Sequence, residues 1–332
     1  MQRIFLKAWK TIATLCALMV LTTGCATAFL PSLTNSPWQP LQLDTQNTLL
    51  DISFTSNPDH GWLVGTGATL METKDGGKSW TPQALELGEQ KYRFSSIDFS
   101  GDEGWVAGQP SLLLHTNDGG ASWNQIPLSE NLPGSPDTVV ATGAEEAEMV
   151  TDVGAIYRTT DGGRNWKALV NDAFGVVRSL HRASDGKYVA VSARGNFFSI
   201  WEPGTDLWQP YNRNSSRRLQ NMGFAPDGRL WMIARGGQVQ FTASTDPDDW
   251  QKATLPESSN SWGFLDMAFR TNEEIWAIGG SGTLIGSFDN GQTWQRDAEA
   301  ESLPANLSRI RFFDGDRGFI LGQRGTILRY AA

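Results

Sequence analysis

Short strand-like patterns follow one another along most of the chain. Residues 95–100 read "SSIDFS" and alternate polar and apolar side chains, which is typical of a half-buried strand. Residues 104–108 read "GWVAG", an apolar run without alternation, as expected of an inner strand packed on both faces. Residues 112–116 ("LLLHT") predict a third strand, and an Asp-Gly-Gly turn then precedes a short segment marked by Trp123. The pattern predicts an all-β protein.

This order of strands repeats at a nearly constant period. The second strand of the unit returns as "GWLVG" at 61–65, "IWAIG" at 275–279 and "GFILG" at 318–322. Four short strands in each period are the unit of a β-propeller blade. The sequence therefore predicts a seven-bladed β-propeller with four-stranded blades. The period is marked by seven tryptophans that lie 42 to 44 residues apart: Trp38, Trp80, Trp123, Trp166, Trp208, Trp250 and Trp294.

The two ends of the repeat complete each other. Residues 325–330 ("GTILRY") read as a third strand without a fourth, and residues 37–43 ("PWQPLQL") read as a fourth strand without the preceding three. Joined, they predict a last blade that is closed by the N-terminal strand, which removes a loose edge from the ring. We therefore expect one propeller domain over residues 36–332 rather than two domains.

The turn before the tryptophan recurs as "TKDGGKSW" at 73–80, "TNDGGASW" at 116–123 and "TTDGGRNW" at 159–166, with a weaker copy, "SFDNGQTW", at 287–294. It resembles the Asp-box of sialidase-like propellers. Its aspartate can accept hydrogen bonds from backbone N–H groups of its own turn, and its second glycine can adopt a positive φ. In the blades that end at Trp208 and Trp250 the turn has drifted while the tryptophan stays. A residue repeated around a ring in this way favours a structural role over a catalytic one.

The N-terminus has the pattern of an export signal. Arg3, Lys7 and Lys10 precede an uncharged segment at 11–23, and "LTTGC" follows at 21–25. We predict a lipoprotein signal peptide over 1–24, lipid modification of Cys25, and a tether over 25–35. Ordinary signal cleavage nearby is the alternative. The other cysteine lies inside the signal, so the mature chain would have no internal disulfide.

Composition and motifs indicate a binding protein rather than an enzyme. The net charge of −9 argues against a nucleic-acid partner. His60, His115 and His181 lack the spacing of metal ligands, and no phosphate-binding loop, dinucleotide loop or nucleophile elbow is present. We predict no catalytic residue, no metal and no cofactor. A glycan-binding or glycoside-hydrolase-like Asp-box propeller stays open, because the spacing of paired carboxylates is a three-dimensional property.

The arginines are unevenly placed. Nineteen Arg accompany eight Lys, and residues 174–240 hold eight Arg and one Lys against four acidic residues. Arg194 and Arg324 occupy the same place in the loop between strands two and three, Arg235 is one residue off, and five others precede or open first strands. Those loops share one face of a propeller. The candidate partner-binding residues are Arg178, Arg194, Arg213, Arg217, Arg218, Arg235, Arg309 and Arg324.

Such a patch on an acidic protein indicates an acidic partner, because the planar guanidinium binds carboxylates in a bidentate manner. The alternative is that these arginines merely pair with neighbouring Asp and Glu residues at the surface. Few acidic residues lie locally, which favours the patch.

The signal, the seven blades and the one-sided arginines together resemble the photosystem II assembly/stability factor of cyanobacteria and chloroplasts. The resemblance covers the mature chain. It implies a monomeric, non-enzymatic propeller at the lumenal face of the thylakoid membrane, lipid-anchored in a cyanobacterial version. It also implies binding to the precursor of the reaction-centre subunit D1 and to early assembly intermediates through the arginines of residues 178–235. A scaffold of an unrelated envelope complex is a further alternative.

Overall fold

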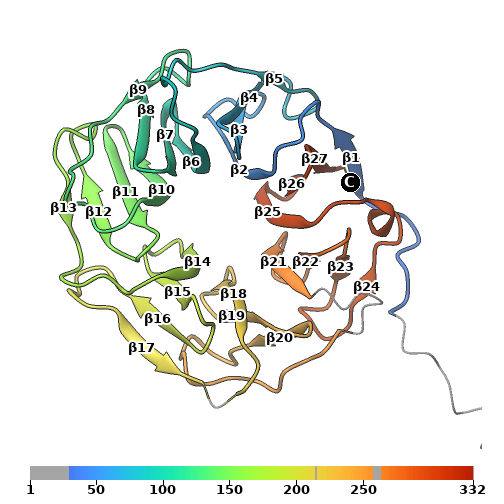
Figure 1. Cartoon of the computed structure of the whole chain (residues 1–332). Coiled ribbons are helices and arrows are strands. Elements are labelled where there is room, and N and C mark those ends of the chain that lie inside the picture. The colour runs from blue at the N-terminus through green and yellow to red at the C-terminus, as the bar shows by residue number, and fades with distance from the viewer. Residues whose placement is uncertain (1–29, 214, 257–262, 332) are drawn as a thin grey trace, which may run out of the picture.

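The computed structural model describes residues 30–213, 215–256 and 263–331. Their strands form seven sheets arranged around a central axis, so the predicted all-β, seven-bladed propeller is confirmed (Figure 1). One short 3-10 helix, η1 (Ala300–Ser302), lies before the last blade. The described residues include no helix that is long and apolar enough to span a membrane.

We number the blades in chain order, and within each blade the first strand is innermost (Figure 1). Blade 1 holds β2 (Leu49–Phe54), β3 (Gly61–Gly65), β4 (Thr69–Thr73) and β5 (Thr81–Pro82). Blade 2 holds β6 (Arg93–Ser100), β7 (Glu103–Gln109), β8 (Leu112–Thr116) and β9 (Asn124–Gln125). Blade 3 holds β10 (Pro136–Gly143), β11 (Glu146–Thr151), β12 (Ile156–Thr159) and β13 (Lys167–Ala168). Blade 4 holds β14 (Val177–Arg182), β15 (Tyr188–Ser192), β16 (Phe197–Trp201) and β17 (Gln209–Asn212).

The remaining blades complete the ring. Blade 5 holds β18 (Leu219–Phe224), β19 (Leu230–Ala234) and β20 (Gln238–Phe241). Blade 6 holds β21 (Phe264–Phe269), β22 (Ile275–Gly279), β23 (Leu284–Ser287) and β24 (Gln295–Arg296). Blade 7 holds β25 (Leu307–Asp314), β26 (Arg317–Gly322), β27 (Thr326–Tyr330) and, as its outer strand, β1 (Trp38–Gln42).

The N-terminal strand closes the last blade as predicted. β1 pairs antiparallel with β27, with Trp38 opposite Tyr330. The Trp38 ring packs edge-on against Tyr330 at 5.1 Å and against Trp276 of blade 6 at 5.6 Å, measured between ring centroids. Aromatic pairs in this arrangement are favourable beyond their buried area, so the closing strand is held by side chains as well as by backbone hydrogen bonds.

Blade 5 departs from the four-stranded pattern. In place of a fourth strand, two isolated bridges join Val239 to Thr254 and Thr242 to Trp250. The segment between them contains "DPDD" at 246–249, where the proline has no N–H to donate and aspartates favour turns. The outer edge of this blade is therefore irregular.

The second strands form the buried layer that their apolar runs predict. All residues of β3, β15, β19 and β22 are buried. The hydrophobic clusters lie between adjacent blades rather than within them: Trp62 and Val64 of blade 1 share a cluster with Ile97 and Val106 of blade 2. Burial on both faces explains why these strands show no polar alternation.

The Asp-box turns are hairpin clamps. In the copy at 116–123, Asp118 accepts hydrogen bonds from the Ser122 N–H (2.9 Å), the Ser122 hydroxyl (2.6 Å) and the Thr116 hydroxyl (2.6 Å). The Thr116 oxygen in turn accepts from the Gly120 N–H, whose residue has the predicted positive φ. Hydrogen bonds from Ser122 and Thr116 lower the pKa of Asp118 to about 2. The tryptophan of the box, Trp123, packs edge-on against Trp62 of the preceding blade.

Replacing Asp118 with alanine is expected to lower the free energy of unfolding by about 1 kcal/mol, because the turn loses its common acceptor. The pKa of Asp118 is depressed in the folded state, so its contribution is present above about pH 4 and is lost as the pH falls towards 2. Urea unfolding between pH 2 and pH 7 measures this. The control is Asp102→Ala, an exposed aspartate whose carboxylate accepts no hydrogen bond among the described residues. Equal losses in both variants would contradict the assigned role.

Candidate functional site

Six of the eight predicted arginines come together on blades 4 and 5. Arg178 is the second residue of β14, Arg194 lies between β15 and β16, and Arg235 lies between β19 and β20. The others follow β17 or precede β18 in the loop that joins the two blades. We call this set the arginine cluster: Arg178, Arg194, Arg213, Arg217, Arg218 and Arg235.

Backbone contacts define the two faces of the ring. The Asp-box turn of each regular blade lies beside the turn between strands one and two, since the Gly76 N–H donates to the Asp59 carbonyl (2.9 Å). The arginine cluster occupies the opposite ends of the strands, where the loop between strands two and three meets the start of strand one. The Arg178 guanidinium, for example, donates to the Ala193 carbonyl (2.6 Å).

The cluster is held together by hydrogen bonds to neutral acceptors. Arg178 also donates to the Gln220 side-chain oxygen on blade 5 (3.1 Å), which joins the two blades. Arg213 donates to the Arg217 carbonyl (2.6 Å), and Arg217 donates to the Arg235 carbonyl (3.3 Å). Carbonyl and amide oxygens orient a guanidinium without neutralising its charge. Three of the six guanidinium groups, those of Arg178, Arg213 and Arg217, are therefore held in place while they keep their positive charge.

None of the six arginines has a carboxylate within 4.0 Å among the residues that the structure describes. Arginines elsewhere differ, as Arg158 pairs with Glu146 at 2.7 Å. The pKa values of the arginines with and without carboxylate partners differ in the same way. Burial lowers the pKa of Arg213, whereas Glu274 raises the pKa of Arg270 against the effect of burial. The positive charge of the cluster is therefore not balanced by carboxylates nearby.

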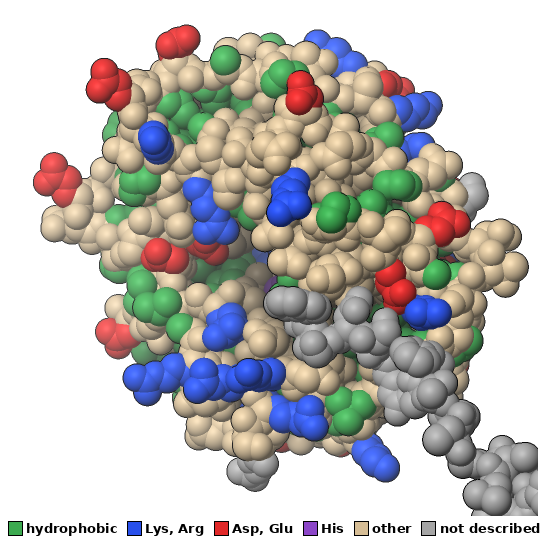
Figure 2. Space-filling view, turned by 45° about the vertical axis from the view of Figure 1, so that its right-hand side comes forward, with side chains coloured by type: hydrophobic (Ala, Val, Ile, Leu, Met, Phe, Trp, Pro, Cys, Tyr) green, Lys and Arg blue, Asp and Glu red, His purple; other side chains and the backbone are tan. Residues whose placement is uncertain are grey.

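The space-filling view shows this gathering. In Figure 2, Lys and Arg side chains form a row below the central hollow, over the part of the ring where Figure 1 places blades 4 and 5, with few acidic side chains between them. Apolar groups lie beside it, since Val176 is 63% exposed two residues before Arg178. The surface offers positive charge next to apolar contact.

The other two predicted arginines lie apart from the cluster. Arg324 sits in the loop between β26 and β27 of blade 7, where its carbonyl accepts a hydrogen bond from Gln42, and blade 6 separates it from blade 5. Arg309 lines the central cavity, and its Nε lies 3.6 Å from the Asp51 carboxylate. The predicted lipidation site, Cys25, lies outside the described residues.

Sequence reasoning missed a polar network in the central channel. Asp51 is 2% exposed and accepts from Arg311 of blade 7 (3.0 Å) and from the Ile97 N–H of blade 2 (3.1 Å). Against the effect of burial, Arg311 and Arg309 hold the pKa of Asp51 below its usual value. Burial instead raises the pKa of Asp266 to about 6. The sequence does show polar residues at equivalent positions of several first strands. Their hydrogen-bond partners lie on other blades, so the sequence alone did not reveal the network.

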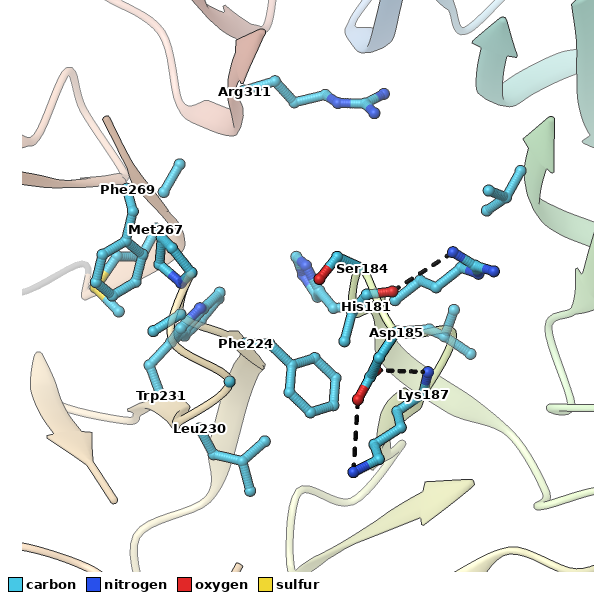
Figure 3. A pocket seen from close by; sticks show the side chains of 18 of the residues that line it. His181, Ser184, Asp185, Lys187, Phe224, Leu230, Trp231, Met267, Phe269 and Arg311 are labelled. Atoms are coloured by element: carbon cyan, nitrogen blue, oxygen red, sulfur yellow. Dashed lines mark hydrogen bonds and ion pairs between the residues drawn. The ribbon is translucent and has the colours of Figure 1, made fainter. Parts of the chain in front are cut away.

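A cavity of about 830 Å³ continues from this channel towards the Asp-box face. Its wall includes His181, Phe224, Trp231, Met267 and Arg311 (Figure 3). Burial lowers the pKa of His181 to about 3, so the imidazole is neutral at physiological pH. The described residues contain no group of three or more metal-ligating side chains.

Comparisons with known proteins decide the family. The model of the family described as "Photosynthesis system II assembly factor YCF48" matches residues 30–331. The chain belongs to this family. The resemblance inferred from the sequence is thus confirmed.

Relatives match the chain over nearly its whole length. A protein of Synechocystis sp. named "Photosystem II assembly lipoprotein Ycf48" is 60% identical over 97% of this chain and 93% of its own length. Its namesake in Trichormus variabilis is 55% identical over 98% of this chain and 96% of its own length. A solved structure described as "YCF48 bound to D1 peptide" is 52% identical, has a TM-score of 0.88, and is matched over 91% of this chain and 99% of that one.

Proposed function

We propose that this protein is a non-enzymatic assembly factor of photosystem II that binds newly made D1, as its precursor, and early reaction-centre intermediates through the arginine cluster. The observation that carries the proposal is the set of six arginines without carboxylate partners among the described residues. Membership of the YCF48 family and a relative solved with a D1 peptide support D1 as the partner. The cluster supplies charge-assisted hydrogen bonds to acidic groups, and Val176 supplies apolar contact.

The proposal includes the place of action. Close relatives are named lipoproteins, and we propose that a lipid on Cys25 holds this chain at the lumenal face of the thylakoid membrane as a monomer. The described chain begins only a few residues later, where Leu30 packs against blades 5 and 6. Five residues span about 18 Å at most, so the anchor would keep the ring close to the lipid surface.

A glycan-active propeller is less well supported. The channel carboxylates serve as ties between blades: Asp266 accepts from Asn221 (2.9 Å) and from the Ile310 N–H (3.0 Å), and Asp98 accepts from the Ala141 N–H (3.0 Å). Carboxylates engaged in this way are poorly placed to act as a general acid and a nucleophile.

One experiment in cells tests partner and anchor together. Tagged wild type, the triple variant Arg178→Ala/Arg217→Ala/Arg218→Ala and Cys25→Ser are expressed in a cyanobacterium that lacks its own copy, and D1 precursor is measured in the purified fractions. We expect the triple variant to recover at least fivefold less D1 while staying in the membrane fraction. We expect Cys25→Ser to move to the soluble fraction.

A matched control replaces three arginines that have carboxylate partners, Arg158, Arg164 and Arg229, with alanine. This variant has the same charge change and should recover D1 normally. Normal recovery by the cluster variant would refute the assigned surface, and membrane retention of Cys25→Ser would refute the anchor.

A further inference from the structure

Three of the seven junctions between neighbouring blades are sealed on the Asp-box face by the same wedge, at Gly77, Gly120 and Gly163. The second glycine of the box lies flat on an aromatic ring of the preceding blade, so that a methyl group on Gly77 would collide with Phe319, and one on Gly120 with Trp62. The Trp62 indole N–H also donates to the Gly119 carbonyl (2.8 Å). At these three junctions the seal has two parts, a box glycine on one blade and a second-strand aromatic on the blade before it. The box glycine of blade 6, Gly291, instead meets Phe241 on the third strand of blade 5.

Both parts of the wedge are missing together at two junctions, between blades 3 and 4 and between blades 4 and 5. The strand register shows which residue of each second strand is equivalent to Trp62. This residue is aromatic in five blades: Trp62, Trp105, Trp231, Trp276 and Phe319. Blade 3 has Glu148 there and blade 4 has Val189. The blades that follow these two, blades 4 and 5, are the ones whose boxes have drifted.

Other side chains close the first of these defects, whereas the second is only partly filled, by Trp250 packed against Phe198 of blade 4. Between blades 3 and 4, the Glu148 carboxylate accepts from the Tyr188 hydroxyl (2.9 Å) and pairs with Arg182 (2.8 Å), and the Tyr188 ring is buried. Between blades 4 and 5 the central cavity extends outwards, lined by Lys187, Glu202, Tyr211, Phe224, Leu230 and Thr245. We call this extension the blade 4/5 groove.

The inner part of the groove is apolar. Figure 3 shows the Phe224 ring pointing into the cavity, with Leu230 and Trp231 on one side and Asp185 and Lys187 on the other. Phe224 remains partly exposed, and Met267 and Phe269 of blade 6 complete the apolar wall. An aromatic side chain open to a cavity is a favourable contact for an inserted apolar group.

The mouth of the groove is acidic. Asp185 and Glu202 are 57% and 54% exposed, and the one lysine between them, Lys187, already contacts both, at 3.5 Å and 3.3 Å. Asp246 and Asp248 lie on either side of Pro247, which lines the cavity on the irregular turn of blade 5. Their charges and that of Glu202 add to the effect of burial in raising the pKa of Tyr211. The charge here is opposite to that of the arginine cluster.

We propose that the blade 4/5 groove binds a partner peptide that carries a hydrophobic side chain next to basic residues. The hydrophobic side chain enters between Phe224, Leu230 and Trp231, and the basic groups meet Asp185, Glu202 and the blade 5 turn. The site lies on the Asp-box face, so it is separate from the arginine cluster and does not rest on the function proposed for it. The protein would then hold an acidic segment on one face and a basic segment on the other.

Two blocked pentapeptides test the site on the full-length protein: Gly-Lys-Phe-Lys-Gly and Gly-Glu-Phe-Glu-Gly, each titrated with a fluorescent label. We expect the lysine peptide to bind wild type at least fivefold more tightly than the glutamate peptide. Thr245→Trp, which fills the mouth, and Glu202→Lys, which reverses its charge, should each weaken the lysine peptide at least fivefold. Both positions are exposed, and thermal unfolding checks that the variants stay folded.

The matched control is Ala121→Trp, a bulky change on the sealed, regular box of blade 2. It should leave affinity for the lysine peptide within twofold of wild type, as should Arg217→Glu/Arg218→Glu on the other face. The site is refuted if neither peptide binds, if the two bind equally, or if Thr245→Trp binds the lysine peptide as wild type does. The groove variants should recover D1 normally, so a failure of one proposal can be distinguished from a failure of the other.

Discussion

Reversing two charges of the arginine cluster with Arg217→Glu/Arg218→Glu is expected to weaken binding of a D1 peptide by about a hundredfold. Both guanidinium groups lack a carboxylate partner among the described residues, so each is available to an acidic ligand. Charge-assisted hydrogen bonds contribute about 1.5–3 kcal/mol each, and the introduced glutamates also repel the ligand. Solvent screening at this exposed surface reduces the total loss to about 2.7 kcal/mol, which corresponds to the stated factor. Isothermal titration calorimetry with the purified protein measures it.

Salt provides a second readout of the same mechanism. Raising the salt concentration from about 0.05 to 0.5 M shortens the Debye length and should weaken wild type far more than the variant. The control Arg158→Glu/Arg164→Glu changes the net charge equally at arginines that already have carboxylate partners, and should bind within about twofold of wild type. An equal loss in the control would mean that total charge, rather than this surface, governs binding.

Replacing Arg311 with methionine is expected to lower the free energy of unfolding by about 3 kcal/mol, because the buried Asp51 then loses its nearest cation. Arg311 of blade 7 also donates to the Ile52 carbonyl of blade 1 (3.0 Å), so it ties the closing blade to the first. Its side chain is 30% exposed to the channel and Arg309 stays within 3.6 Å of Asp51, which keeps the loss at the lower end of the range for buried ion pairs. The melting temperature should fall by about 5 °C, because a domain of about 300 residues unfolds with an entropy of about 0.6 kcal/mol per kelvin.

A second substitution separates the charge effect from lost packing. Asp51→Asn in the Arg311→Met background removes the buried carboxylate that has lost its nearest cation, and it should restore part of the stability. Arg158→Met, which breaks an ion pair whose two side chains are 45% and 37% exposed, should cost less than about 1 kcal/mol. If Arg311→Met were as mild as Arg158→Met, the channel network would not be a tie between blades.

The sequence by itself determined the blades, their number and the closure by the N-terminal strand. Each of these depends on a local signal that recurs, such as the apolar second strand or the Asp-Gly-Gly turn, and repetition lets one copy support the next. The repeat also predicted correctly that Arg194 lies in the loop between the second and third strands of its blade. Strand register fixes which end of a blade a loop occupies, and chain order fixes which blades are neighbours.

Only the tertiary structure decided what these residues contact. Arg309 and Arg178 both lie near the start of a first strand, yet Arg309 faces Asp51 in the channel and Arg178 bonds to Ala193 and Gln220 at the rim. The same holds for the groove. A drifted box and a missing second-strand aromatic are visible as letters, but Tyr188 fills one of the two gaps and leaves the other open. Contacts between blades join residues about 40 positions apart in sequence, and the period alone does not specify which side chains meet across that distance.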